Sequence, residues 1–241
     1  FIIAGTQKGG TTALYEYFRS HQNICMADKK ELHFFDEDRY FVKKNPNYSK
    51  YHRYFNPNDH SQVIGEATPI YMYWNKSIER IYVYNPQIKL IIILRNPIER
   101  AFSHWNMERD KGRESRTFLK AILDEESKIK SPNYSQNKIL SYLDRGYYSK
   151  QIKNIYNYFN KNQLLILRSE ELRENPDRTL MNVADFLSIP PFNPVDHKEI
   201  NSRSYPHKMS DDEHTLLSGF YEEEFSSLEN ILGWDLSLWS K

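Results

Sequence analysis

Residues 1–18 read FIIAGTQKGGTTALYEYF, and this stretch decides the fold. An apolar run of strand character leads into a glycine-rich loop. Behind the loop, Leu14, Tyr17 and Phe18 are spaced as on one face of a helix. Where a strand ends in such a loop and a helix begins behind it, the unpaired backbone N–H groups of the loop and the helix start can surround an anion. The stretch therefore predicts a phosphate-binding loop, and a tight turn without a ligand is the alternative interpretation.

The loop differs from the phosphate loop of ATPases, which reads G-x-x-x-x-G-K-[ST], in the position of its lysine. Gly5 and Gly10 fit that template, but Thr11 occupies the lysine position, and Lys8 lies earlier in the loop. Glycines let the backbone approach a phosphate closely. The candidate phosphate-binding residues are Gln7, Lys8, Gly9, Gly10, Thr11 and Thr12.

Three further apolar runs, 63–67, 89–95 and 163–169, read as buried strands. The last two are almost continuously apolar, which is the pattern of a parallel strand covered on both faces. Helical patterns lie between and after these runs. The alternation predicts an α/β fold of three layers, a P-loop-type fold with a central parallel sheet flanked by helices. We expect residues 1–241 to form a single domain, with its ligands at the carboxyl ends of the strands.

A second anion site is predicted in LRNPIERAFSHW (94–105). Arg95 leaves the end of a buried strand, where its planar guanidinium group can bind a phosphate through two hydrogen bonds. Asn96, Arg100 and Ser103 follow at helical spacing and share one polar face. The alternative interpretations are a salt bridge for Arg95 and a surface hydroxyl for Ser103.

Two helix starts are marked by capping residues. NPIE (96–99) offers an asparagine N-cap with proline at the first helical position, and SDDE (210–213) has the pattern of a capping box. The segment 36–60 is different, because it is polar, rich in asparagine and interleaved with aromatic residues. It is either a substrate-facing loop or a surface segment held by aromatic packing.

The composition argues against several classes of protein. A net charge of +1 gives no global attraction to nucleic acid, and the eight histidines show no metal-ligand spacing. No apolar run approaches the ~18 residues that span a bilayer. One cysteine, Cys25, precludes an internal disulfide and fits a reducing compartment, so we expect a cytoplasmic location. The chain starts inside a strand-like run, which fits a domain excised from a larger protein.

These motifs resemble those of the sulfotransferases that use 3′-phosphoadenosine 5′-phosphosulfate (PAPS). The similarity is greatest to the branch that contains the heparan sulfate sulfotransferases and many bacterial relatives. TQKGGTTAL resembles the family's 5′-phosphate motif, and LRNPIERAFSHW resembles its 3′-phosphate motif. Further motifs match in the family's order along nearly the whole chain: KELHFFD (30–36), GEATPIY (65–71), RGYYSKQI (145–152) and NSRSYP (201–206). The resemblance implies an enzyme that releases adenosine 3′,5′-bisphosphate (PAP) and needs no metal.

The resemblance also implies roles for individual residues in an in-line displacement that moves the sulfuryl group to an acceptor hydroxyl. Lys8 stabilises the leaving phosphate, Glu31 is the general base, and His33 orients the acceptor or shares its proton. The nucleotide is bound by the glycine loop and by Arg95, Ser103, Tyr147, Ser202, Arg203, Ser204 and Tyr205. Glu66 and Tyr71 are expected near the acceptor.

The sequence departs from the family pattern at two places. Ala67 stands where relatives that act on heparan often have lysine, which counts against a polyanionic acceptor. In NSRSYP, Asn201 and Ser202 stand where lysine and glycine are usual, whereas Arg203 and Pro206 are retained.

The acceptor stays open among a glycan, a lipid or sterol-like alcohol and an acyl chain on a carrier protein, and an amine is less favoured. Two other functions compete with sulfuryl transfer. A P-loop kinase or NTPase would need a metal-binding aspartate at a strand end, and none is apparent. A non-catalytic nucleotide-binding module is disfavoured by the presence of Lys8 and Glu31.

Overall fold

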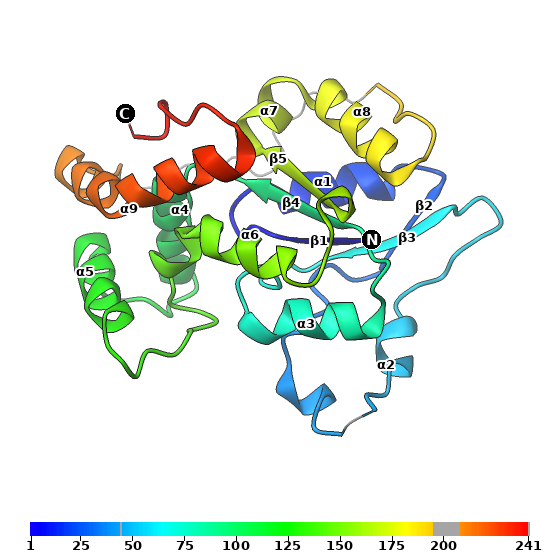
Figure 1. Cartoon of the computed structure of the whole chain (residues 1–241), viewed down its shortest axis with the longest axis horizontal. Coiled ribbons are helices and arrows are strands. Elements are labelled where there is room, and N and C mark those ends of the chain that lie inside the picture. The colour runs from blue at the N-terminus through cyan, green and yellow to red at the C-terminus, as the bar shows by residue number, and fades with distance from the viewer. Residues whose placement is uncertain (44, 195–207, 241) are drawn as a thin grey trace. The chain divides into compact units, whose positions relative to one another are not determined.

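The computed structural model describes residues 1–43, 45–194 and 208–240. Within them lies a sheet of five parallel strands in the order β2-β3-β1-β4-β5 (Figure 1). The strands are β1 (Ile2–Gly5), β2 (Ile24–Met26), β3 (Val63–Ala67), β4 (Leu90–Leu94) and β5 (Leu164–Arg168). A central parallel sheet flanked by helices confirms the predicted α/β fold of P-loop type.

The chain divides into two compact units. The sheet unit comprises Phe1–Leu94 and Ile155–Ser202, and the helical unit comprises Arg95–Asn154 and Arg203–Lys241. That the two units form one domain over residues 1–241 stays a prediction.

Burial explains the strands of the sheet unit. Every residue of β1 and β4 is buried, as expected for central strands that are covered on both faces. The four strands predicted from apolar runs are confirmed to within one residue at each end. The sequence pattern does not predict β2, because a run of three residues inside a polar stretch carries too little periodicity.

Helices cover both faces of this sheet. Figure 1 shows α1, α7 and α8 on one side and α3 on the other. The core under the first group joins Ile3 and Ile93 of the sheet to Leu14 of α1 and Val183 of α8. The helices of the sheet unit are α1 (Thr11–Arg19), α2 (Ser49–His52), α3 (Asn75–Tyr84), α7 (Ser169–Glu174) and α8 (Pro176–Leu187), with the 3₁₀ turns η1 (Asp38–Tyr40) and η3 (Lys161–Gln163).

Two helices of the helical unit begin at the predicted capping residues. The Asn96 side chain accepts a hydrogen bond from the Ile98 N–H at the start of α4, and Ser210 and Glu213 form the predicted capping box of α9. The elements of this unit are α4 (Pro97–Asp110), α5 (Phe118–Ile129), η2 (Asp144–Gly146), α6 (Tyr148–Tyr156, which ends at the boundary) and α9 (Asp211–Leu232).

The segment 36–60 is held by aromatic packing. The ring of Phe34 stacks on Tyr40 at 4.8 Å between centroids, and Phe35 contacts Tyr51 at 5.1 Å. Such ring pairs contribute about 0.5–1.5 kcal/mol beyond the area that they bury. The packing accounts for the aromatic residues structurally, and a role of this segment toward a substrate stays a prediction.

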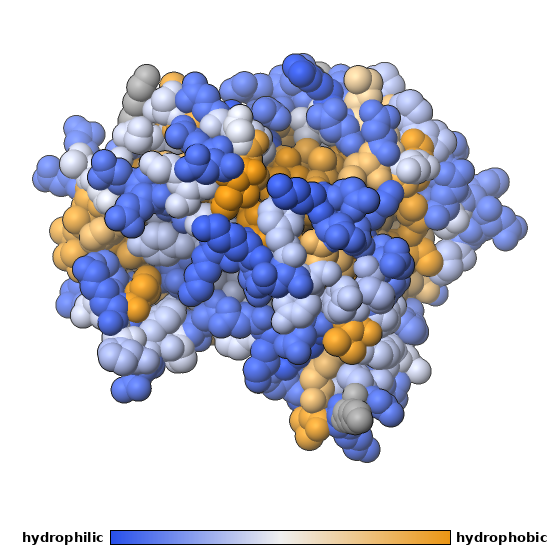
Figure 2. Space-filling model, viewed as in Figure 1, coloured by the Kyte–Doolittle hydropathy of each residue, from blue (hydrophilic) through white to orange (hydrophobic). Residues whose placement is uncertain are grey.

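Hydrophilic residues cover most of the face seen in Figure 2. The most exposed large apolar side chains, Val42, Val83 and Leu238, lie in separate segments of the chain. Within the described ranges, no helix combines the length and the apolar character that a membrane span requires.

We predict that Gly9→Ala destabilises the protein. A Cβ at this position would lie 2.6 Å from the Ile93 carbonyl oxygen and 2.5 Å from Thr6 Oγ1, so the loop would have to leave β4. The expected loss is about 1–3 kcal/mol, measured by urea unfolding. The control is Gly219→Ala in α9, where a Cβ meets nothing within 4 Å, and this change should stabilise by about 1 kcal/mol. Equal stability of both variants would contradict the close approach of Gly9 to the Ile93 carbonyl.

Candidate active site

The glycine loop lies at the carboxyl edge of the sheet, between β1 and α1. The Thr6 N–H and hydroxyl both donate to the Ile93 carbonyl of β4, at 3.0 and 2.8 Å. The Gly9 N–H donates to the Thr6 carbonyl at 3.0 Å. Since a side chain at Gly9 would collide with the Ile93 oxygen, the loop can take this path only with glycine there.

The start of α1 is suited to an anion. Its N-cap, Gly10, has φ 109°, a left-handed conformation that glycine adopts without strain. No side chain caps the first turn, and the turn contains no acidic residue. The N–H groups and the dipole of α1 therefore favour a negative ligand in front of the loop. Of the predicted loop residues, Gly9 and Thr11 are buried and the others half-buried, namely Gln7, Lys8, Gly10 and Thr12.

Glu31 and His33 belong to a segment that is tied to the same edge of the sheet. The Glu31 N–H donates to the carbonyl of Ala67, the last residue of β3, at 2.9 Å. The Glu31 carboxylate accepts a hydrogen bond from Lys30 Nζ at 2.7 Å and lies 3.7 Å from Nε2 of His33. Because β3 pairs with β1, the structure brings this segment and the glycine loop to the ends of neighbouring parallel strands.

Asp36 completes the cluster, although the motif pattern gives it no role. Both of its carboxylate oxygens lie 3.2 Å from Nδ1 of His33, and the residue is 1% exposed. The imidazole of His33 thus lies between the carboxylates of Asp36 and Glu31. The sequence HFFD (33–36) places this aspartate three residues after His33. Outside a helix or strand, however, such spacing does not predict that the two side chains meet.

The two carboxylates stabilise the protonated imidazole. Asp36, and then Glu31, raise the pKa of His33 to about 9, although burial opposes the shift. The interaction with His33 and the charge of Lys30 lower the pKa of Glu31 to about 2, again against burial. At neutral pH the cluster therefore holds an ionised Glu31 beside an imidazolium.

The predicted catalytic residues have an unusual backbone. In the described part of the chain, four residues other than glycine have positive φ, and Lys8 (69°), Glu31 (61°) and His33 (52°) are three of them. This conformation is unfavourable for a residue with a Cβ and persists only where the surroundings impose it. Such residues concentrate at functional sites.

Glu66 and Tyr71, predicted near the acceptor, are fully buried. The Glu66 carboxylate accepts hydrogen bonds from Tyr51 Oη at 3.1 Å and Thr68 Oγ1 at 2.5 Å. Burial raises the pKa of Glu66 to about 7. Neither side chain is therefore open to an acceptor in this structure.

The predicted 3′-phosphate residues lie in the helical unit. Arg95 donates to Oε2 of Glu99 at 2.8 and 3.1 Å, so the salt bridge that was the alternative interpretation is present. Ser103 is 1% exposed, which makes it a buried rather than a surface hydroxyl. Tyr147 is half-buried, and burial raises its pKa to about 12. The remaining predicted nucleotide contacts lie outside the described residues: Ser202, Arg203, Ser204 and Tyr205.

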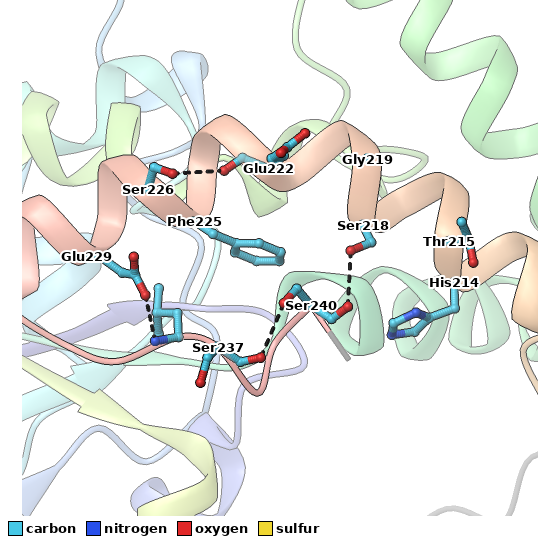
Figure 3. Close-up of a pocket in the computed structure, with 11 residues that line it drawn as sticks. His214, Thr215, Ser218, Gly219, Glu222, Phe225, Ser226, Glu229, Ser237 and Ser240 are labelled. Carbon is cyan, nitrogen blue, oxygen red and sulfur yellow. Dashed lines mark hydrogen bonds between the residues drawn. The ribbon is translucent and has the colours of Figure 1, made fainter.

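A separate cavity of about 460 Å³ lies in the helical unit, between α9 and the residues that follow it (Figure 3). It is lined by polar side chains such as Ser218, Glu222 and Ser237, and by none of the predicted site residues that the structure describes. Within residues 1–43, 45–194 and 208–240, no group of three His, Cys, Asp or Glu side chains could hold a metal ion.

Comparison with known proteins agrees with the fold and with the motifs. The profile of the sulfotransferase domain family matches residues 1–224. The chain therefore belongs to this family of enzymes, which confirms the family and the enzyme class that its motifs resemble.

Two curated relatives act on heparan sulfate according to their names. The chain is 33% identical over 192 residues to heparan sulfate glucosamine 3-O-sulfotransferase 5 of Mus musculus, a match that covers 79% of this chain and 53% of the relative. It is 29% identical over 201 residues to the human bifunctional heparan sulfate N-deacetylase/N-sulfotransferase 2, covering 80% of this chain and 22% of the relative. The chain thus spans about half or less of the length of these relatives.

A sulfotransferase from Alicyclobacillus acidocaldarius has the same fold. Its crystal structure superposes with a TM-score of 0.84 and 26% identity, and the match covers 100% of this chain and 98% of the other. The sulfotransferase domain of the curacin biosynthetic pathway is more distant, with a TM-score of 0.54 and 16% identity over 80% of this chain and 74% of its own, and it supports the fold alone.

We predict that His33 titrates near pH 9 and that Asp36→Asn moves its pKa down toward the ordinary value of about 6.5. The pKa of His33 is higher in the folded than in the unfolded protein, so its interaction with Asp36 stabilises the fold. This contribution is fully present below about pH 6.5 and is lost as the pH rises through about 9. The stability gap between wild type and Asp36→Asn should therefore narrow from pH 6 to pH 10. NMR titration and melting curves measure both effects.

The control for this prediction is Asp38→Asn. Asp38 is an exposed aspartate that pairs with Arg80 and Lys76, so its loss should leave the His33 titration unchanged. A wild-type His33 that titrates near pH 6.5 would contradict the cluster.

Proposed function

We propose that this domain transfers the sulfuryl group of PAPS to an acceptor hydroxyl. The observation that carries the proposal is the cluster of Glu31, His33 and Asp36 at the end of β3, beside the strand that opens into the glycine loop. A site for an anion and an ionised carboxylate thus belong to neighbouring strand ends. Membership of the sulfotransferase family supports the reaction class.

The residues of the loop fit a phosphate donor. The uncapped first turn of α1 leaves N–H groups for the 5′-phosphate, and Gln7, Thr11 and Thr12 are proposed as further polar contacts. When bound, PAPS supplies an activated sulfuryl group. Lys8, in the middle of the loop, would neutralise the charge that develops on the departing phosphate. Arg95 and Ser103 are proposed for the 3′-phosphate, where Arg95 would exchange Glu99 for the nucleotide, and Tyr147 is proposed to lie near the nucleotide.

Glu31 is the proposed general base. With a pKa lowered to about 2 it is ionised over the whole physiological range, so it is always ready to accept a proton. Such a weak base suffices only if the proton leaves late. Sulfuryl transfer resembles phosphoryl transfer, which passes through a loose transition state. The hydroxyl of the acceptor becomes strongly acidic only as its oxygen forms the bond to sulfur. Glu31 therefore receives the proton when the acceptor oxygen has become the stronger acid.

His33 is proposed to orient Glu31 rather than to act as the base. Its pKa of about 9 leaves it protonated at neutral pH, so it has no free lone pair for a proton. As a cation it faces Glu31 and can also donate to a sulfuryl or acceptor oxygen. Asp36 balances its charge from the buried side.

A hydroxyl of a glycan is the first acceptor to test, because the names of the curated relatives specify heparan sulfate. Ala67, at the position where such relatives often carry lysine, argues for a glycan of lower charge. A lipid alcohol and a carrier-bound acyl chain remain the other proposed acceptors. A kinase or NTPase is disfavoured, since the profile of the sulfotransferase domain family matches residues 1–224.

Binding of the nucleotide should be independent of metal. We expect PAP to raise the melting temperature in the presence of EDTA, because the loop N–H groups and Lys8 supply the positive field. ATP with Mg²⁺ should have little effect. A shift with ATP and Mg²⁺, but none with PAP, would favour the kinase or NTPase instead.

Replacement of the proposed base should separate catalysis from binding. Glu31→Gln is expected to lower kcat by about 10²–10⁴-fold and to leave the Kd for PAP within about twofold. The assay follows transfer from radiolabelled PAPS to a glycan or another acceptor. Glu37→Gln, a nearby half-buried glutamate, serves as the matched control and should retain activity. Unchanged turnover in Glu31→Gln would place the base elsewhere.

A further inference from the structure

The segment that carries Glu31 and His33 rests on a buried polar network that the proposed reaction does not use. The centre of this network is the Glu66 carboxyl in β3, which accepts hydrogen bonds from the side chains of Tyr51 and Thr68 and interacts with the hydroxyl of Tyr71. All four residues are nearly or fully buried. A buried carboxyl with this many partners has a specific orientation.

Tyr71 connects this network to the catalytic segment. Its hydroxyl oxygen accepts hydrogen bonds from the N–H groups of Phe34 at 3.0 Å and Phe35 at 3.3 Å. Because the two N–H groups occupy the lone pairs of the Tyr71 oxygen, its one hydroxyl proton faces the other side, where Glu66 and Thr68 lie. Burial raises the pKa of Tyr71 well above its usual value, so this proton stays in place.

We propose that Tyr71, oriented by Glu66, is a positioning residue for sulfuryl transfer. Its hydroxyl fixes the backbone directly after His33 and so holds Glu31 and His33 in their left-handed conformations. The inference rests on the proposed function and adds to it two side chains that need not contact a substrate. Backbone strain of this kind requires surroundings that impose it, and the Tyr71 hydroxyl supplies two of the necessary hydrogen bonds.

Tyr51 offers a matched control within the same network. Its hydroxyl also donates to Glu66, the residue is 4% exposed, and its ring contacts Phe34 and Phe35. In the described structure the hydroxyl of Tyr71, and not that of Tyr51, also accepts the two backbone N–H groups. Replacing either tyrosine by phenylalanine therefore removes a hydroxyl beside Glu66, but only Tyr71→Phe also removes the acceptor of the Phe34 and Phe35 N–H groups.

The experiment compares Tyr71→Phe and Tyr51→Phe by melting temperature, by transfer kinetics and by NMR titration of His33. Tyr71→Phe should lose more stability than Tyr51→Phe, because it also leaves the N–H groups of Phe34 and Phe35 without their acceptor. Tyr71→Phe is expected to lower kcat about tenfold or more with the KM for PAPS within about twofold, since buried N–H groups lose their acceptor. Tyr71→Phe should also move the His33 pKa down from about 9, whereas Tyr51→Phe should change neither kcat nor the titration.

Equal kcat and equal His33 titration in the two variants would overturn the positioning role and leave Tyr71 as an ordinary core residue. The titration needs no turnover, so it decides this inference separately. A wild-type protein that transfers no sulfuryl group would count against the proposed function alone. Glu66→Gln is the second variant should Tyr71→Phe fail to fold. It leaves one carbonyl oxygen where the carboxylate accepts from the hydroxyls of Tyr51 and Thr68, and an unchanged His33 titration in it would again overturn the role.

Discussion

The position of β1 between two parallel neighbours is the constraint on which the candidate site depends. Pairing with β3 and β4 brings the carboxyl ends of three strands to one edge of the sheet. The glycine loop leaves β1 there, in contact with the Ile93 carbonyl, and the Glu31 N–H is bonded to Ala67 at the end of β3. The sheet therefore gathers a loop for an anion and a carboxylate that are far apart in the sequence.

The same edge imposes an unfavourable backbone on the residues with the proposed chemistry. A left-handed conformation costs roughly 1–2 kcal/mol for a residue with a Cβ. Lys8, Glu31 and His33 each adopt it, so the surrounding hydrogen bonds must offset the cost. The bond from Glu31 to Ala67 and the two bonds to Tyr71 are of this kind. The catalytic geometry is therefore a property of the packed sheet and not of local propensity.

The fold could be predicted from the sequence to a large extent, because its signals are local. Continuous apolar runs located four strands, and Asn96 and Ser210 marked two helix starts through capping chemistry that involves only neighbouring residues. The short β2 was missed, since its pairing with β3 is a long-range contact that leaves no periodicity in three residues.

The site was less accessible to prediction for the same reason. The motif containing Glu31 and His33 could be recognised, but Asp36 as the partner of His33 depends on a turn with positive φ that residue types do not specify. The network that joins Tyr51, Glu66 and Tyr71 depends on side chains that meet only after folding. For Arg95, a phosphate contact and a salt bridge were both open from the sequence, and in this structure its guanidinium group donates to Glu99.

The central claim is that the glycine loop is a nucleotide site next to the Glu31 cluster. A crystal structure of the protein with PAP tests it most directly. The 5′-phosphate should lie against the N–H groups at the start of α1, within hydrogen-bonding distance of Lys8 Nζ. A nucleotide bound elsewhere, with the loop and Lys8 making no contact to a phosphate, would contradict it.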